Sequence, residues 1–554
     1  MHWLGRYRLL VLASICVFWT GLIFLGYFFP MTPFLSAPWR GEQGFEDLLR
    51  REGRKTATRN DFVFLGLDQS TLQMPPLAPD EVANNRAFQL MTERPFPWSR
   101  EIYALLLDRL FGAGARLVMF DMMFDQQKEG DEAFHAALDR YRDKVVLAAN
   151  FDMASPVAQA VTPNDALIPP PQLQDDRVGF ANFWADPIDG RVRAVAYRVT
   201  NRQLAGLPPH PSQEVYQSLS ARALTEIGHA NDVPQGFDAH MLRFSAVNAY
   251  EPRPLYEVFD PKFWRFNYAD GAFFKDKIVI VGASAQIFHD VVDTPMSPAT
   301  LGPALHLQAM AAALDHEFLR PVPSKVRLAL VAAAGLVAWS LVAFFRRPLL
   351  CVGALVLLTV TYLGTARFLY DKTGLLLLTV PVLSALVLSG SLSLGFEYFL
   401  ERLEKLRTRR TLERYVSKNL VAEILENPDS YYSSLRGVRV PVTILFSDLI
   451  GFTTLAEKAD PEALVAQLNE YLSRMTSEIF SNGGTLDKFI GDAIMAVWGV
   501  PYTGEHDHVS AVMAALEMRI GLDELNKVRI ARGQHPVKIG IGLHCGDAIV
   551  GKIG

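Results

Sequence analysis

Four long apolar runs constrain this chain more than any other feature. Residues 9–29 contain no charged side chain and are long enough to cross a hydrocarbon core of roughly 30 Å. Three more runs, at 328–345, 349–366 and 374–397, follow one another closely. A cleaved signal peptide is the alternative for the first run, but the run is longer than the apolar region of such peptides and no small-x-small site precedes Pro30. The pattern predicts four transmembrane helices, the first of them an uncleaved anchor.

Basic residues predict the orientation of these helices. They precede the first run, fill the loop after the second and follow the fourth: Arg6, Arg8, Arg346, Arg347, Lys405, Arg407, Arg409 and Arg410. Because cytoplasmic flanks carry an excess of Lys and Arg, we expect all three sites in the cytoplasm and residues 31–325 outside. No cysteine lies between residues 30 and 325, which excludes a disulfide framework there and suits a bacterial periplasm. We therefore expect a multi-pass protein of the bacterial inner membrane, in contact with membrane lipid.

This organisation divides the chain into five parts. They are an N-terminal anchor (1–30), an extracytoplasmic domain (31–325), three transmembrane helices (326–398), a cytoplasmic linker helix (399–436) and a second globular domain (437–554). The linker permits an apolar stripe at Leu403, Leu406, Leu412 and Val416, which suits either a paired helix or a solvated stalk. The net charge of −5 argues against a nucleic-acid partner, because neutralising phosphates requires basic patches.

The extracytoplasmic part alternates strand-like and helix-like segments. Residues 61–68, 116–121 and 277–282 are apolar runs that predict buried strands, and residues 101–112 have the apolar spacing of a helix. The alternation predicts an α/β domain with a mostly parallel sheet. Asp68 and Asp121 end two of the strands, at the edge where such sheets often bind ligands.

A series of short motifs in this part resembles the second of the CHASE extracellular sensor families. The motifs are Phe96-Pro97-Trp98-Ser99-Arg100, Phe120-Asp121, Asp189-Gly190-Arg191, Lys277-Ile278-Val279-Ile280-Val281-Gly282, Asp293-Thr294-Pro295 and Leu305-His306. The resemblance implies sensing of a ligand or stress, without identifying the stimulus. Candidate sensor residues are Asp68, Asp121, Asp125 and Asp293, and the alternative for each is capping, turn formation or ion pairing.

The C-terminal part has the element order of a ferredoxin-like fold. Residues 441–447, 461–480, 485–490, 493–498, 507–530 and 537–544 predict strand, helix, strand, strand, helix and strand. Asp448 follows the first strand, and Asp492 lies in the turn between the second and third. If these strands are neighbours, the two carboxylates share one edge and would repel unless cations lie between them. A site for two Mg²⁺ or Mn²⁺ ions is one interpretation, and a pair of ordinary turn residues is the other.

Three motifs in this part resemble class III adenylate and guanylate cyclases. They are Phe446-Ser447-Asp448-Leu449-Ile450-Gly451-Phe452-Thr453, Asp487-Lys488-Phe489-Ile490-Gly491-Asp492-Ala493, and the stretch from Ile539 to Gly546, and Arg414-Tyr415-Val416-Ser417 before them fits the bacterial branch. The resemblance covers residues 412–554. It implies that Asp448 and Asp492, with the Leu449 carbonyl, hold two metal ions, and that Gly451, Phe452 and Thr453 receive the phosphates. Lys488 would contact the adenine ring, which favours ATP over GTP.

The resemblance implies a membrane-bound adenylate cyclase, a phosphorus–oxygen lyase that converts ATP to 3′,5′-cyclic AMP and pyrophosphate. Its sites would form between the two catalytic domains of a homodimer. A guanylate cyclase, and a receptor whose cyclase-like domain only dimerises or binds nucleotide, are the alternatives; a diguanylate cyclase would need a GG(D/E)EF turn in place of Gly483-Gly484-Thr485. The family places a second base-recognition residue and a transition-state Asn and Arg beyond Gly554, so the catalytic domain is expected to be incomplete and this chain alone inactive. His506, Asp507 and His508 suggest a metal site, but their place at a helix start predicts capping.

Overall fold

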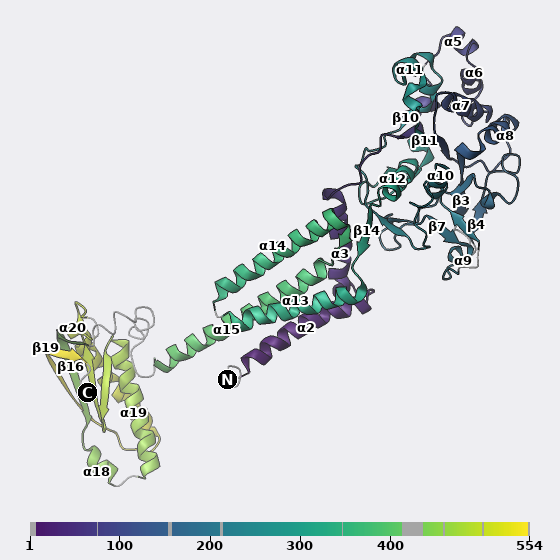
Figure 1. The fold of residues 1–554 in the computed structure, drawn as a ribbon. Coiled ribbons are helices and arrows are strands. Elements are labelled where there is room, and N and C mark those ends of the chain that lie inside the picture. The colour runs from purple at the N-terminus through teal and green to yellow at the C-terminus, as the bar shows by residue number, and fades with distance from the viewer. Residues whose placement is uncertain are drawn as a thin grey trace. The chain divides into compact units, whose positions relative to one another are not determined.

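The computed structural model describes residues 7–74, 76–152, 158–210, 214–345, 347–412, 436–457, 460–500 and 503–551. The chain divides into two compact units, Met1–Leu394 and Gly395–Gly554 (Figure 1). Of the predictions above, those on Arg6, Arg346, Arg414–Ser417 and the last three residues of the chain lie outside the described residues.

A mostly parallel sheet forms the centre of the extracytoplasmic region. Its strands run in the order β10-β1-β11-β2-β3, all parallel, with β5 parallel to β3 and β4 antiparallel at the edge. Their bounds are β1 Phe62–Leu67, β2 Leu117–Asp121, β3 Val145–Asp152, β4 Gln159–Val161, β5 Val178–Phe180, β10 Arg253–Pro254 and β11 Ile278–Ala283. The four strands β1, β11, β2 and β3 are mostly buried runs of apolar residues, as expected for a sheet covered on both faces. The predicted α/β architecture is confirmed.

Helices cover both faces of this sheet. The helices α6 (Arg86–Glu93), α7 (Glu101–Gly112) and α8 (Asp131–Arg140) pack with alternate strand residues in one core, and α10 (Leu219–Glu226) and α12 (Gly302–Leu314) pack in the other. The smaller elements of this unit are α4 Gln69–Leu72, α5 Pro79–Ala83, α9 Asn201–Leu204, α11 Pro261–Phe266, β6 Ala194–Val195, β7 Arg198–Thr200, β8 Val215–Gln217, β9 His240–Leu242, β12 Val291–Val292, β13 Thr300–Leu301, β14 Phe318–Pro321 and β15 Leu375–Leu376.

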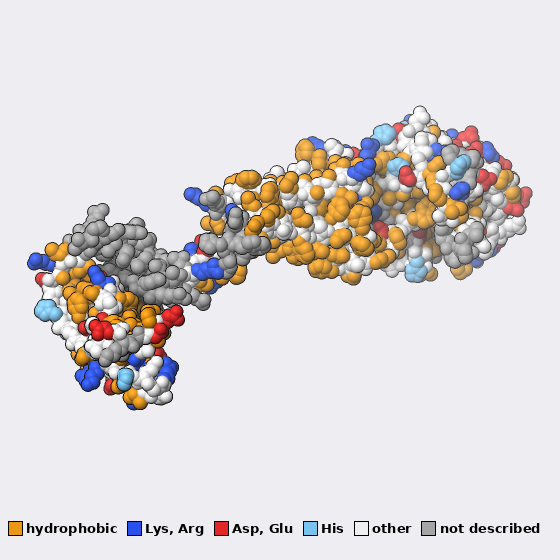
Figure 2. Space-filling model, turned by 90° about the horizontal axis from the view of Figure 1, so that it is seen from below, with side chains coloured by type: hydrophobic (Ala, Val, Ile, Leu, Met, Phe, Trp, Pro, Cys, Tyr) orange, Lys and Arg blue, Asp and Glu red, His pale blue; other side chains and the backbone are white. Residues whose placement is uncertain are grey.

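Among the described residues, four helices are long and apolar enough to cross a membrane, which is the number that the sequence predicted. They are α2 (Arg8–Phe28), α13 (Ser324–Phe344), α14 (Pro348–Thr373) and α15 (Val380–Leu412). Hydrophobic side chains dominate the surface of this helical part of the first unit (Figure 2). The first helix lies tightly against the second, because a Cβ atom on Gly335 would approach Thr20 Oγ1 to 2.2 Å.

The boundary between the third and fourth spans differs from the prediction. Arg367 and residues 371–373 lie inside α14 rather than in a loop, and the helix ends only at Gly374, which adopts a left-handed φ of 69°. The fourth helix then begins at Val380, six residues later than predicted, because residues 375–376 pair with β14 as a short strand. Strand pairing therefore replaces helix at the start of the fourth apolar run.

The helix α3 (Pro33–Glu52) follows the first span and was not predicted. Its buried positions include Glu42, Asp47 and Arg50, so the apolar periodicity that would reveal a packed helix is missing. Polar partners replace apolar contacts here. They lie in other parts of the same unit and are described with the site.

The second unit contains the predicted ferredoxin-like order. Its elements are β16 Arg436–Leu449, α18 Phe452–Ala456, α19 Pro461–Ser481, β17 Thr485–Ile490, β18 Ala493–Trp498, α20 Asp507–Ala531 and β19 Ile539–Gly551. The sheet is antiparallel throughout, in the order β17-β18-β16-β19. The α19 and α20 helices cover one face in a core with Leu445, Ile494 and Trp498. The predicted strands at both ends of the domain are longer than expected, because β16 and β19 pair along almost their whole length.

Candidate active site

The structure brings Asp448 and Asp492 together at one edge of the catalytic sheet. Asp448 is the penultimate residue of β16, and Asp492 lies in the turn between β17 and β18, after Gly491, whose φ is +64°. The two strands β16 and β18 pair directly, so the turn that follows β17 lies beside the end of β16. Desolvation and the Asp448 carboxylate raise the pKa of Asp492, and the backbone N–H groups of Asp492 and Leu449 oppose this shift.

These carboxylates fit a divalent cation. They are hard oxygen donors, and the repulsion that raises the pKa of Asp492 would be relieved by a positive charge between them. Among the described residues there is no group of three or more His, Cys, Asp or Glu side chains that could hold a metal ion. Mg²⁺ is commonly held by one or two carboxylates together with substrate phosphates, so two acids suffice for such a site.

A short helix begins directly after the first of these acids. Ile450 donates a hydrogen bond from its N–H to the carbonyl of Lys538, Gly451 adopts a left-handed φ of 80°, and α18 starts at Phe452. A residue with a Cβ atom would be strained at this positive φ, so glycine suits the turn that separates β16 from α18. Gly451 therefore lies in the turn directly after β16, and Phe452 and Thr453 are the first two residues of α18.

Lys488 lies on the face of the sheet that α19 and α20 do not cover. On β17 its partner is Met495, which in turn pairs with Phe446 of β16. Its side chain is 60% exposed, and Nζ lies 3.3 Å from Oδ2 of Asp487. Phe446 lies on the same face and is also exposed, which gives this face an uncovered apolar surface.

The sensor candidates occupy three different environments. Asp68 caps α4, since its Oδ1 accepts a hydrogen bond of 2.8 Å from the N–H of Thr71. Asp293 lies 3.4 Å from Nε of Arg191. Asp121 lines a cleft of about 390 Å³ at the carboxyl edge of the parallel sheet, whereas Asp125 is exposed nearby. Of the candidates in the described chain, Asp121 is thus the one that lines this cleft.

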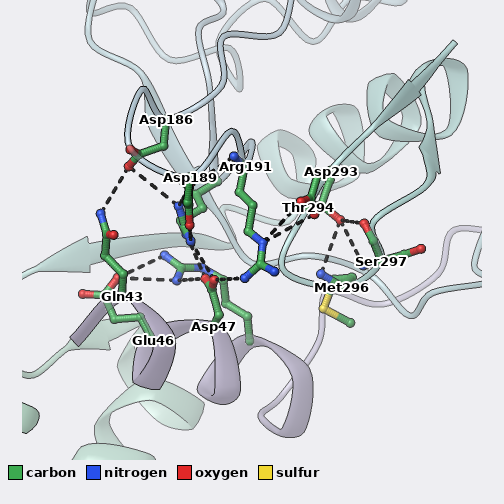
Figure 3. A network of polar contacts seen from close by, with 12 residues as sticks. Gln43, Glu46, Asp47, Asp186, Asp189, Arg191, Asp293, Thr294, Met296 and Ser297 are labelled. Carbon is green, nitrogen blue, oxygen red and sulfur yellow. Dashed lines mark hydrogen bonds and ion pairs between the residues drawn. The ribbon is translucent and has the colours of Figure 1, made fainter. Parts of the chain in front are cut away.

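Asp293 belongs to an ion-pair network centred on Asp47 of α3 (Figure 3). The buried Asp47 carboxylate lies 2.7 Å from Arg193, 3.1 Å from Arg191 and 3.2 Å from Arg50. Arg191 is the last residue of the Asp189-Gly190-Arg191 motif and Arg193 lies two residues after it, so the network joins that motif to α3. The contacts favour ion pairing as the role of Asp293.

One further prediction concerns the start of α20. Asp507 is its first residue and accepts a hydrogen bond of 2.6 Å from the N–H of Gly504 in the preceding loop, whereas the N-cap residue His506 makes no side-chain capping hydrogen bond, so the predicted capping is not found here. Two residues near Asp121 were not predicted as site residues, Asp290 and His306. Asp290 lies in a loop outside every motif, whereas His306 belongs to the Leu305-His306 motif, which gave no role for it, and lies within a helix of mostly apolar residues.

The chain belongs to the CHASE2 family of sensor-domain proteins, because the CHASE2 domain matches residues 16–345, more than half of its length. Residues 439–554 match the adenylate and guanylate cyclase catalytic domain. The protein therefore combines a CHASE2 sensor domain with a class III nucleotide cyclase domain, which is a lyase domain.

Individual relatives match about a fifth to a third of the chain. Adenylate cyclase 1 of Rhizobium meliloti (strain 1021) is 31% identical over 144 residues, which is 26% of this chain and 21% of the relative. The adenylate cyclase of Anabaena cylindrica is 33% identical over 192 residues, 33% of this chain and 34% of the relative. The crystal structure of the guanylyl cyclase Cya2 is 42% identical, with a TM-score of 0.21, over 21% of this chain and 60% of that one. The chain thus spans about a third or less of these two curated relatives.

Proposed function

We propose that this protein is a membrane-bound adenylate cyclase that converts ATP to 3′,5′-cyclic AMP and pyrophosphate and is regulated by its extracytoplasmic CHASE2 domain. The observation that carries this proposal is the juxtaposition of Asp448 and Asp492, two acids from separate strands whose charges act on each other. Adenylate cyclases among the similar proteins support the same activity.

In this proposal Asp448 and Asp492, with the Leu449 carbonyl, hold two Mg²⁺ or Mn²⁺ ions. Bound cations would neutralise phosphate charge and lower the pKa of the attacking ribose hydroxyl. Gly451, Phe452 and Thr453 bind the phosphates through backbone N–H groups. The 3′-oxygen forms a bond to the α-phosphorus and loses its proton, while the bond from that phosphorus to pyrophosphate breaks.

Base selection and assembly belong to the same proposal. Lys488 would donate a hydrogen bond to an adenine ring nitrogen in the site of a second copy, where the partner supplies the acidic residues. Its exposed position on the uncovered sheet face supports this role, and so does the exposed Phe446 on the same face. The proposed arrangement is a homodimer with two equivalent sites.

The proposed location is the bacterial inner membrane. Four apolar helices provide the spans, and the positions of the basic residues favour a cytoplasmic catalytic domain. The regulatory stimulus would then reach the CHASE2 domain from outside the cell.

A direct assay tests the activity. The full-length gene product in detergent or nanodiscs is supplied with Mg²⁺ or Mn²⁺ and either ATP or GTP, and the cyclic nucleotide and pyrophosphate are quantified. We expect cyclic AMP from ATP, and at least about a hundredfold less from Asp448→Ala and Asp492→Ala, because the metal ligands act on the transition state. Glu462→Ala, an exposed residue of the α19 first turn, is the matched control and should keep the wild-type rate.

Two other outcomes would change the conclusion. Cyclic GMP as the main product would identify a guanylate cyclase, a candidate that the 42% identity to Cya2 supports. No product from either nucleotide, with Mn²⁺ binding unaffected by Asp448→Ala in electron paramagnetic resonance, would favour a receptor whose cyclase domain is not catalytic.

A further inference from the structure

A cleft of about 390 Å³ opens at the carboxyl edge of the CHASE2 sheet. The strands β1 and β2 lead to helices that pack in one core of the sheet, whereas β11, which lies between them, leads to α12 in the other core. The chain therefore leaves neighbouring strands toward opposite faces at this edge. In open α/β sheets the crevice at such a point is the usual ligand site. Its volume is within the range of small-molecule pockets.

Two acidic side chains line the cleft, and no described lining residue is Lys or Arg. One is Asp121, at the end of β2, and the other is Asp290, from the loop before α12. Burial and the charge of Asp290 raise the pKa of Asp121 well above its usual range, and burial raises the pKa of Asp290. The two carboxyl groups therefore lie close enough to repel each other when both are ionised.

Other buried acids in this domain have polar partners, which are backbone N–H groups for Glu42 and Asp260 and arginines for Asp131 and Asp47. Asp131 lies 2.7 Å from Arg100, and Asp47 lies 2.7 Å from Arg193. In the described chain, no Lys or Arg forms a comparable ion pair with Asp121 or Asp290, although buried charges are normally paired. The two acids of the cleft thus differ from the other buried acids of this domain in lacking such a partner among the described residues, and a cationic ligand would provide one.

A buried histidine supports the same inference independently. His306 of α12 is 1% exposed, and its Nε2 has no hydrogen-bond partner within normal distance. This nitrogen lies 3.7 Å from Oδ2 of Asp121, and the imidazole contacts the ring of Phe183, which lines the cleft. Burial lowers the pKa of His306 to about 3, so the ring is neutral and adds no positive charge. Its Nδ1 is occupied by Ser220 Oγ at 3.0 Å.

The rest of the lining is mainly apolar and aromatic. Phe96, Phe183 and Phe288 come from three separate segments, and Met122 and Met123 follow Asp121. Aromatic faces attract cations and also bury hydrocarbon. Asn150 adds a neutral polar group at the end of β3.

We propose that this cleft binds an organic ammonium cation with a compact apolar body, with Asp121 and Asp290 around the charged nitrogen and the aromatic side chains around the body. A primary ammonium group offers three hydrogen-bond donors to two carboxylates and a neutral acceptor. The physiological meaning rests on the proposed regulation by the CHASE2 domain, whereas binding itself does not depend on cyclase activity.

Calorimetric titration of the full chain in detergent tests this proposal with phenethylamine as the probe. Neutral 2-phenylethanol and anionic phenylacetate serve as matched ligands with the same body. We expect saturable binding of the amine only. Equal binding of the alcohol would show an apolar pocket without charge recognition, and tighter binding of phenylacetate would show an anion site at the start of α12; either result overturns the proposal. Binding of Ca²⁺ or Mn²⁺ in place of the amine would overturn it too.

Variants locate the binding. Asp121→Asn and Asp290→Asn should each weaken binding of the amine by about tenfold or more, because each removes one of the two carboxylates that would pair with the charge of the ligand. Asp125→Asn, an exposed neighbour on the same segment, should bind like the wild type. Gly302→Ala keeps both carboxyl groups, but its Cβ atom would lie 2.7 Å from Asp290 Oδ1. Because the Asp290 side chain would have to shift, this variant should also bind the amine more weakly.

Two readouts keep this test separate from that of the cyclase. Thermal unfolding followed by intrinsic fluorescence shows whether each variant is folded. The comparison of the three ligands on the wild type remains valid even if a variant does not fold. Amine binding that is unchanged in all three cleft variants would place it elsewhere and refute the assignment. Loss of amine binding with intact cyclic AMP synthesis, or the reverse, distinguishes failure of this proposal from failure of the proposed enzyme.

Discussion

At the scale of residues, the catalytic domain has an acidic pair and a lysine in different places on its sheet. Desolvation and the Asp448 carboxylate raise the pKa of Asp492 at one edge of the sheet. Lys488 is exposed on the uncovered face and forms an ion pair with its neighbour Asp487. Because Lys488 has so few contacts in its own unit, it can be changed without damage to the core, and its proposed role in base recognition can be tested there directly.

Replacement of Lys488 by glutamate should lower the kcat/KM for ATP by about tenfold or more relative to GTP, because a carboxylate cannot donate to adenine but can accept from the guanine N–H groups. Product analysis with both nucleotides in equal concentration measures this ratio. Lys527→Glu, an exposed lysine of α20, is the control for added negative charge. An unchanged ratio in Lys488→Glu would remove Lys488 from base recognition.

At the scale of elements, α3 connects the sensor domain to the fourth membrane helix. Its Asp47 holds the arginines of the Asp-Gly-Arg segment, while the Glu42 carboxylate accepts hydrogen bonds of 2.6 to 3.0 Å from the N–H groups of Thr379 and Val380. The second contact caps the N-terminus of α15, where a negative charge is favoured. One short helix thus contacts both the sensory loops and the start of the helix that leads toward the catalytic unit.

The Glu42 contact should make stability depend on pH. Burial raises the pKa of Glu42 from 4.5 to about 7; Glu46 adds to the shift, and the two N–H groups and Arg327 oppose it. The folded state therefore binds an extra proton between these values, so the stability of the wild type relative to Glu42→Gln should fall as pH rises from about 4.5 to about 7. The slope would reach at most about 1.4 kcal/mol per pH unit.

Denaturation of both proteins in detergent at a series of pH values measures this difference. Glu132→Gln, an exposed acid in the first turn of α8, is the control and should follow the wild type. Parallel curves for the wild type and Glu42→Gln would show that Glu42 does not titrate in this window.

The elements also show what the sequence could and could not predict. Regular apolar spacing predicted α7 and the hairpin strands β17 and β18 with correct bounds, and the Gly-Asp turn predicted that Asp492 would approach Asp448. The helix α3 was not predicted because several of its buried positions are polar. The Asp47 and Glu42 side chains bind partners more than a hundred positions away in the sequence. Asp290 and His306 were not predicted as site residues for a related reason, since only tertiary packing places a loop and a helix beside the end of β2.

At the scale of the whole molecule, the catalytic unit is expected to function as a pair. Its acids lie at one edge of the sheet and Lys488 on the uncovered face, so each proposed site takes residues from two copies. Such an arrangement is isologous, and defects in different residues can therefore complement each other.

Co-expression of Asp448→Ala and Lys488→Ala chains tests this arrangement. Half of the dimers would be mixed, and each mixed dimer would retain one site with both groups intact, so activity should recover to about a quarter of the wild-type level. Each variant alone, at the same total amount, provides the baseline for the cyclic AMP measurement. Activity of the mixture equal to the mean of the two variants would refute sites shared between copies.

The uncovered apolar surface around Phe446 also affects how the activity would depend on the number of copies of the chain in the membrane. Chains held in a bilayer by apolar helices meet by lateral diffusion in two dimensions, and their crowding there depends on membrane area rather than on cell volume. A modest rise in expression would therefore raise the paired fraction steeply at low abundance and hardly at all once the bilayer is well populated. Dilution into excess lipid should silence the enzyme without any change in its chemistry.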